Sequence, residues 1–143
     1  LSLGGTTPSN INIIDYVTIA STGDASDFGD LTLSRSNCSG AASSVRAVAA
    51  GGGSPSNSDV IDYVTIASTG DASDFGDLTQ AGKAACPGSN GTRAVFAGRH
   101  TPGKQTTMDY ITIASTGDAS DFGDLTETRR ALGACSDGHG GLS

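Results

Sequence analysis

The residues of this chain best suited to chemistry are aspartates that recur at every third position of a segment containing glycine and serine. They form three sets: Asp24, Asp27 and Asp30; Asp71, Asp74 and Asp77; and Asp118, Asp121 and Asp124. Calcium takes roughly six to eight oxygen ligands, so clustered carboxylates could bind it. The spacing differs from that of an EF-hand loop, and aspartate also forms turns by accepting hydrogen bonds from local backbone N–H groups. We therefore expect structural aspartates, with calcium as the alternative and no other cofactor.

Histidine and cysteine offer little further chemistry. Neither His100 nor His139 is paired with a serine or cysteine in a recognisable nucleophile motif. The cysteines Cys38, Cys86 and Cys135 form no CxxC pair, which argues against a zinc site and a disulfide framework. We expect three small buried residues, with a disulfide between chains as the alternative.

The aspartates belong to a repeated block, IDYVTIASTGDASDFGDLT. It begins at Ile14 and Ile61 and returns, as MDYITIASTGDASDFGDLT, at Met108, so the period is 47 residues. Periods of about 20–50 residues indicate solenoids, propellers or other arrays. Near-identical units present the same groups again and again, whereas an active site needs unlike groups that converge on one point. The repeat therefore predicts a protein that is not an enzyme, with no catalytic or cofactor-binding residues.

Each repeat predicts four short strands and no helix. Residues 14–20 are β-branched and aromatic, which indicates a strand. A turn is expected over residues 21–30, with Phe28 plugging the core, and a second short strand begins at Leu31. A third strand covers residues 45–50 and ends in glycine, and a weaker fourth precedes it. Four strands per repeat predict an all-β propeller of ~47-residue blades, with a stacked β-repeat array or solenoid as the alternative.

The same pattern in the other repeats gives two structural expectations. Tyr16, Tyr63 and Tyr110 should occupy equivalent positions of a strand inside an antiparallel blade. Phe28, Phe75 and Phe122 should all be buried, because each is the only large apolar residue of a polar turn.

We expect one repeat domain over residues 1–143, with blocks near 14–60, 61–107 and 108–143 plus 1–13. Leu1 to Gly5 resembles the end of a glycine-ending strand, which Leu142 and Ser143 would begin. Three blades do not close a ring, whereas two chains would give a six-bladed one. The expected partner is thus a second copy, forming a homodimer, and the alternative is a longer parent chain.

The variable parts of the repeat lie in one proline-containing loop. Its three versions cover residues 5–12, 54–59 and 100–107. Loops on one face of a propeller commonly bind ligands, although a surface loop also drifts without function. The candidate ligand-facing residues are Pro8, Asn10, Pro55, Asn57, His100, Pro102 and Lys104.

Composition limits the partners. The formal charge is −7, with 15 acidic against 8 basic residues, so we expect no nucleic-acid footprint. No apolar run of ~18 residues is present, so we expect no membrane insertion, and no signal peptide is recognisable.

The order of features resembles the kelch repeat. A Gly-Gly doublet (Gly51-Gly52), a tyrosine strand (Tyr63), an aromatic turn (Phe75) and a basic residue (Lys83) follow one another. Phe stands where kelch usually has Trp, and the doublet is broken at Gly98-Arg99. The resemblance is to kelch-like architecture and not to the strict consensus.

The whole chain is also similar to repeats in structural proteins of tailed bacteriophages, especially marine ones. Those repeats look like IDYITIASTGNATDFGDLT followed by a basic residue and a TRGVFGGG-type strand. The resemblance implies a non-enzymatic structural or adhesion module of the virion, tail- or capsid-associated and assembled in the bacterial cytoplasm. Other virion proteins or a host-surface glycan would be its partners. The alternative is a lectin-like glycan- or protein-binding propeller outside any virion.

Overall fold

The computed structural model describes residues 1–135, which form strands and connecting loops and contain no helix. The predicted all-β class is therefore confirmed. Within the same residues, no helix capable of spanning a membrane is found.

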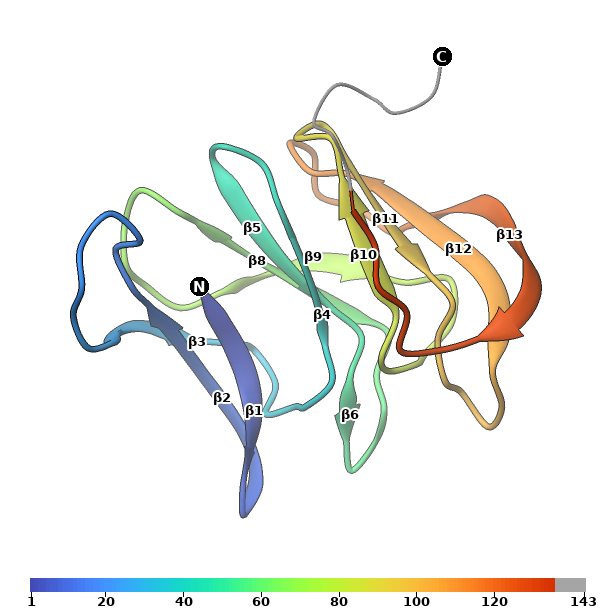
Figure 1. The fold of residues 1–143 in the computed structure, drawn as a ribbon, viewed down its shortest axis with the longest axis horizontal. Helices are drawn as coiled ribbons and strands as arrows, with labels where there is room; N and C mark the ends of the chain where they lie inside the picture. Colours follow the sequence, from blue (N-terminus) through green and yellow to red (C-terminus); the bar gives the residue numbers. More distant parts are fainter. Residues whose placement is uncertain (136–143) are drawn as a thin grey trace.

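The strands form three antiparallel sheets in which strand order follows chain order (Figure 1). The first sheet contains β1 (Ser2–Thr7), β2 (Ser9–Tyr16) and β3 (Ser26–Asp30). The second contains β4 (Ser39–Ala42), β5 (Arg46–Ala50), β8 (Val60–Thr65) and β9 (Ser73–Asp77). The third contains β10 (Cys86–Ser89), β11 (Arg93–Ala97), β12 (Gln105–Thr112) and β13 (Ser120–Arg129). A small hairpin of β6 (Gly53–Ser54) and β7 (Ser56–Asn57) lies between β5 and β8.

The three sheets share one register, as expected from the 47-residue period. The tyrosines lie opposite a serine of the next strand in each case: Tyr16–Ser26, Tyr63–Ser73 and Tyr110–Ser120. Each tyrosine also packs edge-to-face on a phenylalanine, with ring centroids 5.9 Å apart: Tyr16–Phe28, Tyr63–Phe75 and Tyr110–Phe122. The predicted equivalence of the tyrosines inside antiparallel sheets is confirmed, although the first sheet has three strands and not four.

The N-terminal residues form the glycine-ending strand of the first sheet, as predicted. β1 pairs with β2 as β5 pairs with β8, so Leu3 lies opposite Ile14 as Ala50 lies opposite Ile61. Leu142 and Ser143, the expected start of this strand, lie outside the described residues.

Two strand boundaries were predicted wrongly. The tyrosine-containing strand ends at Tyr16 in the first repeat instead of reaching Ala20, and Ile19 is 98% exposed. The expected turn over residues 21–30 contains strand β3, and Leu31 lies after that strand instead of beginning one. The strand was not predicted because its sequence, SDFGD, contains glycine and aspartate, which are uncommon in strands. Gly29, at φ +145°, lets its backbone approach the Gly70–Asp71 peptide, where a Cβ would meet backbone atoms.

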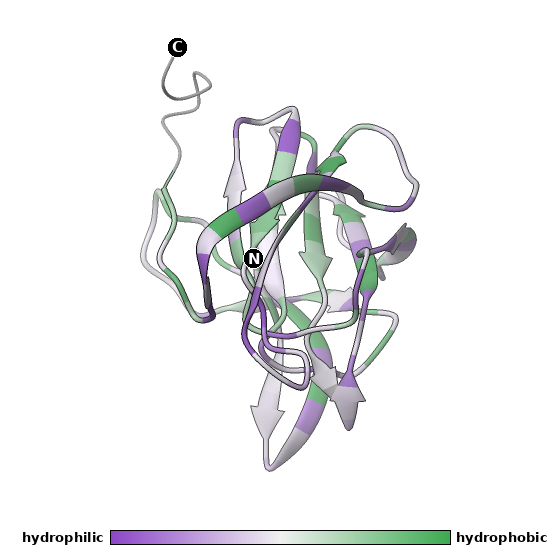
Figure 2. Cartoon of the chain, turned by 90° about the vertical axis from the view of Figure 1, so that its right-hand side faces the viewer, coloured by the Kyte–Doolittle hydropathy of each residue, from purple (hydrophilic) through white to green (hydrophobic). Residues whose placement is uncertain are grey.

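The core lies within and between the sheets, and two of the three phenylalanines are in it. Phe28 and Phe75 are 5% and 3% exposed, whereas Phe122 is 50% exposed, so the prediction of burial is wrong for Phe122. Phe28 packs against residues of the second sheet and Phe75 against residues of the third, whereas no sheet among residues 1–135 packs on the outer side of the third one. Figure 2 shows β13 in front, with hydrophobic and hydrophilic residues alternating along it.

Prediction for the core. Replacing Phe75 by Ala should lower the free energy of unfolding by about 3–5 kcal/mol, because the ring is buried among Ile61, Ile111 and Phe96. The matched control is Val45→Ala in an exposed turn, which should change it by less than ~0.5 kcal/mol. Urea unfolding followed by circular dichroism measures both. Equal losses for the two variants would contradict this assignment of the core.

Candidate functional site

The three variable loops lie along one edge of the molecule. The β1–β2 turn, the β6–β7 hairpin and the loop between β11 and β12 point the same way, at the bottom of Figure 1. Pro8, Pro55, Pro102 and Lys104 are exposed there. The structure therefore groups the predicted ligand-facing loops on a single edge.

Two asparagines link these loops. The Asn10 side-chain amide donates to the carbonyl of Gly53 at 2.7 Å, and the Asn57 amide donates to the carbonyl of His100 at 3.0 Å. Both bonds span 43 residues, because each loop reaches the corresponding point of the next one. At the third equivalent position the chain has Lys104, whose side chain is exposed. Asn10 and Asn57 thus hold the row of loops together, and the residues beside them are left to face solvent.

His100 is part of the same framework. Its backbone exchanges hydrogen bonds with Lys83, N to O at 2.9 and 3.1 Å. Its Nδ1 is buried and has no hydrogen-bond partner in the described part of the chain. The imidazole is therefore partly buried between loops instead of being fully presented to solvent.

The acidic segments connect neighbouring sheets. The amides of Gly70 and Ala72 donate to the carbonyls of Phe28 and Asp30, both at 2.7 Å, and the Asp71 carboxylate accepts from the Asp30 amide at 3.0 Å. One repeat further on, Gly117, Ala119 and Asp118 make the same bonds to the second sheet. Asp71 and Asp118 therefore have a structural role, but they cap the strand of the preceding sheet, 41 residues away, and not the local turn that the sequence analysis expected.

The described residues contain no group of three His, Cys, Asp or Glu side chains placed to hold a metal ion. The other candidates are exposed, one in a loop and the rest along strands β3, β9 and β13: Asp24, Asp27, Asp30, Asp74, Asp77, Asp121 and Asp124. Asp121 accepts from the Gly123 amide at 3.2 Å, and Asp124 accepts from the Thr106 hydroxyl at 2.8 Å. Partial loss of hydration, followed by the negative charges of Asp59, Asp118 and Asp74, raises the pKa of the exposed Asp77.

A buried ion pair lies at each junction between consecutive sheets, and the sequence analysis did not find it. Arg35 and Asp62 are both fully buried and meet at 2.9 Å. The Arg35 guanidinium also donates to the carbonyls of Ala49, Gly51 and Val60 at 2.6–3.0 Å. These bonds compensate the loss of hydration of a buried guanidinium.

The carboxylate of this pair is bound from the preceding repeat. Thr32 donates to Asp62 through its amide at 3.1 Å and its hydroxyl at 2.6 Å. At the second junction Thr79 does the same to Asp109, at 3.2 and 2.6 Å. There the cation is Arg99, which also donates to the carbonyl of Gln80.

The two arginines come from opposite sides of their junctions. The position equivalent to Arg35 is Gly82, and the position equivalent to Arg99 is Gly52. A Cβ on Gly82 would lie 2.6 Å from Cδ of Arg99, so Arg99 fills the space that a side chain at position 82 would need. Each junction therefore has an arginine at one of the two equivalent positions and a glycine at the other, and at the second junction the arginine fills the space beside the glycine.

This exchange corrects the sequence interpretation. Lys83, the basic residue of the kelch-like order, lies beside His100 and takes no part in either ion pair. Two departures from the repeat pattern could have revealed the exchange from the sequence: Arg99 replaces the second glycine of the doublet, and a glycine stands at position 82.

The cysteines differ from one another. Cys86 is buried as predicted, whereas Cys38 is partly buried and Cys135 is exposed, so the prediction is wrong for Cys135. The Cys38 thiol donates to the carbonyl of Leu3 at 3.3 Å, and burial raises its pKa. All three are free thiols within the described residues.

No protein-family model matches this sequence, and no curated protein matches it. The site is therefore interpreted from its own geometry.

Prediction for the junction. Arg99→Gly should cost about 3–5 kcal/mol of stability, because Asp109 would stay buried without its cation. Gly82→Arg should also destabilise, because two arginines would compete for one space. The double variant moves the arginine to the side it occupies at the first junction. It should be more stable than either single variant, with a coupling energy of about 2–3 kcal/mol. Urea unfolding of the four proteins gives this cycle, and additive losses would contradict the exchange.

Proposed function

We propose that this chain is a non-enzymatic structural or adhesion module of a tailed-bacteriophage particle, built from kelch-like propeller blades. The observation that carries the proposal is a rigid repeated framework that holds three different loops in a row along one edge.

Several contacts support the propeller architecture. In each four-stranded sheet, successive strands pair in chain order, as in a propeller blade. The first strands of neighbouring sheets lie side by side: Ser39 Oγ donates to the carbonyl of Ala85 at 2.8 Å, and Ser89 Oγ donates to that of Ala42 at 2.9 Å. The sheets spread outward from β4 and β10 in Figure 1. This arrangement favours a propeller over a stacked solenoid, in which successive units pair in parallel.

The contrast between framework and loops favours a binding or structural role. The junction contacts recur with the same residue types, so equivalent groups lie in every unit and do not converge on one point. The loops differ in charge and shape while their backbones are linked through Asn10 and Asn57. Loops held by a rigid scaffold are where proteins generally place their binding residues.

Prediction for the virion role. Particles from a bacterial host that carries the gene should be purified on a density gradient and digested for mass spectrometry. Peptides of this chain, including its variable loops, should co-purify with the particle proteins at a constant ratio across the particle band. Recovery of the chain only from the particle-free fractions would contradict a role in the virion.

The second candidate is a glycan- or protein-binding propeller outside a virion, favoured by the exposed Pro8, Pro55, Pro102 and Lys104. A glycan array probed with the purified chain tests it. Binding should fall when Lys104 is replaced by Ala and should be unchanged for Asp27→Asn, an exposed residue of β3 outside these loops. Binding that both variants retain equally would contradict the assignment of the loops.

A further inference from the structure

The outer sides of the first and third sheets each carry one half of the residue set that forms the junctions inside the chain. We define the exit face as Phe122, Asp124, Thr126 and Arg129 of β13. The entry face consists of Asp15, Val17, Gly23, Asp24 and Ala25. Each of these residues lies 47 or 94 positions from a residue that takes part in an interior junction. The entry and exit faces therefore carry the same chemistry as the two interior contacts.

Phe122 and Val17 are much more exposed to solvent than the equivalent residues inside the chain. Phe122 is 50% exposed, whereas Phe28 and Phe75 are at most 5% exposed. Val17 is 52% exposed, whereas its equivalents Val64 and Ile111 are 5% and 3% exposed. Apolar surface is thus left uncovered on both faces at the positions that interior junctions bury.

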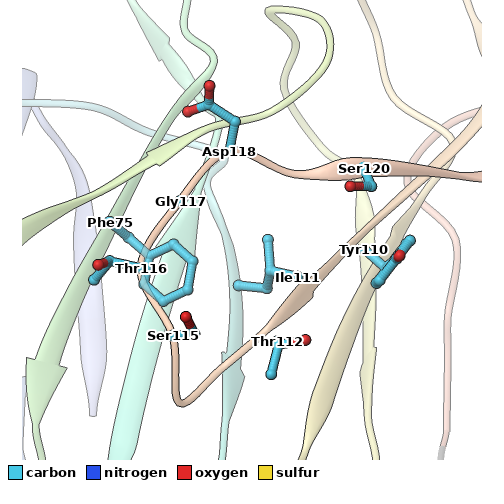
Figure 3. Close-up of a pocket in the computed structure, with 9 residues that line it drawn as sticks. All are labelled: Phe75, Tyr110, Ile111, Thr112, Ser115, Thr116, Gly117, Asp118 and Ser120. Atoms are coloured by element: carbon cyan, nitrogen blue, oxygen red, sulfur yellow. The ribbon is translucent and has the colours of Figure 1, made fainter.

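Phe122 has a matching hollow on the entry face. Inside the chain, Phe75 of the second sheet lines a pocket with Tyr110, Ile111 and the loop 115–118 of the third sheet, as Figure 3 shows. The equivalent residues of the first sheet, Tyr16, Val17, Thr18, Ser21, Gly23, Asp24 and Ser26, form a hollow of about 180 Å³. Among the described residues, no phenylalanine lines this hollow. Phe28 and Phe75 each pack against the sheet that follows their own, which leaves Phe122 as the phenylalanine that a second copy could present to the hollow.

The polar groups match as well. Thr126 is equivalent to Thr32 and Thr79, which each donate two hydrogen bonds to a buried aspartate, Asp62 or Asp109. The entry-face residue equivalent to these two aspartates is Asp15. Asp15 is only partly buried, unlike Asp62 and Asp109. Arg129 is equivalent to Arg35, and Gly5 is equivalent to Gly52. The two end faces therefore combine one arginine with one glycine, as each interior junction does.

The first sheet also lacks the strand that β4 and β10 supply to the other two. In its place a hollow of about 340 Å³ is lined by apolar residues that include Leu1, Leu3, Ala41 and Ala47. Residues 133–135 are equivalent to the first residues of β10 and follow Ala131, whose amide donates to the carbonyl of Ala84 at 3.1 Å. The Ala84 amide makes the same bond to Asn37 at 2.9 Å. Residues 133–135 are thus positioned to pair with a β1 strand, as β10 pairs with β11.

We propose that a second copy of this chain docks head to tail, with the exit face of each copy on the entry face of the other. Phe122 lines the Tyr16–Ser26 hollow as Phe75 lines the equivalent one inside the chain, Arg129 and Thr126 bind Asp15, and residues 133–135 pair with β1. Two copies contribute six sheets, within the usual range of roughly four to eight for closed propellers, whereas three would contribute nine. The number of copies rests on the proposed propeller, while the junction rests on the contacts within the chain.

The first test is the mass of the purified chain in solution. Light scattering coupled to size exclusion should give twice the mass of one chain at micromolar concentration. Arg129→Glu on the exit face and Val17→Asp on the entry face should each give folded monomers. Their matched controls are Arg130→Glu, beside the junction, and Thr18→Asp, whose equivalent Thr65 stays exposed inside the row. Both controls should remain dimers.

The second test distinguishes a contact between two different faces, exit on entry, from a contact of one face with the same face of the other copy. Mixing Arg129→Glu with Val17→Asp leaves one intact pair of faces between the two variants, so the mixture should form heterodimers although neither variant dimerises alone. A folded wild-type monomer, open filaments of many chains, or a mixture that stays monomeric would each overturn the proposal. These measurements use the purified chain alone, so a negative result of the particle experiment would leave their outcome unchanged.

Discussion

A buried ion pair lies at each junction between consecutive sheets. A guanidinium and a carboxylate that are both out of water are costly, and the pair is stable only where the remaining hydrogen-bonding groups find partners. Around Asp62 those partners are the amide and hydroxyl of Thr32, and around Arg35 they are three backbone carbonyls. At the first junction Arg35 and Thr32 of one repeat donate to Asp62 of the next. At the second junction Arg99 and Asp109 belong to the same repeat, and the bonds from Thr79 to Asp109 and from Arg99 to the carbonyl of Gln80 join the two sheets.

The strict framework explains how the loops can vary. The aromatic pairs and the aspartate caps lie outside the loops that carry Pro8, Pro55 and Pro102, whereas Arg99 of the second ion pair lies at the start of the loop between β11 and β12. Changes at the loop residues beyond Arg99 therefore leave the junctions intact, provided that the linking amides of Asn10 and Asn57 keep their acceptors. A scaffold of this kind suits a repeated protein whose partners differ, because recognition changes without a change in the fold.

Much of this architecture could be predicted from the sequence. The β-branched runs around Tyr16, Tyr63 and Tyr110 and the 47-residue period indicated the strands and the equivalence of the sheets. The SDFGD segment was predicted as a turn, because its strand is stabilised by pairing and by close backbone contact with the next sheet rather than by strand-forming side chains. Phe122 was predicted to be buried because repeat equivalence ignores which unit stands at the end of a row. An alignment of the repeats shows that glycine stands at position 82 where the first repeat has Arg35, and at position 52 where the next repeat has Arg99. It does not show that the two arginines reach equivalent aspartates, Asp62 and Asp109, because that depends on which residues meet in space.

The central claim is that one junction is used at every step, including the step between two copies. Amide hydrogen exchange resolved by NMR tests it directly at Gly23 and Ala25. Their equivalents Gly70, Ala72, Gly117 and Ala119 donate to the preceding sheet at 2.7–2.8 Å. The account predicts that Gly23 and Ala25 are protected in the wild-type chain as strongly as these four amides. Exchange of Gly23 and Ala25 at the rate of an open loop, with the other four protected, would contradict it.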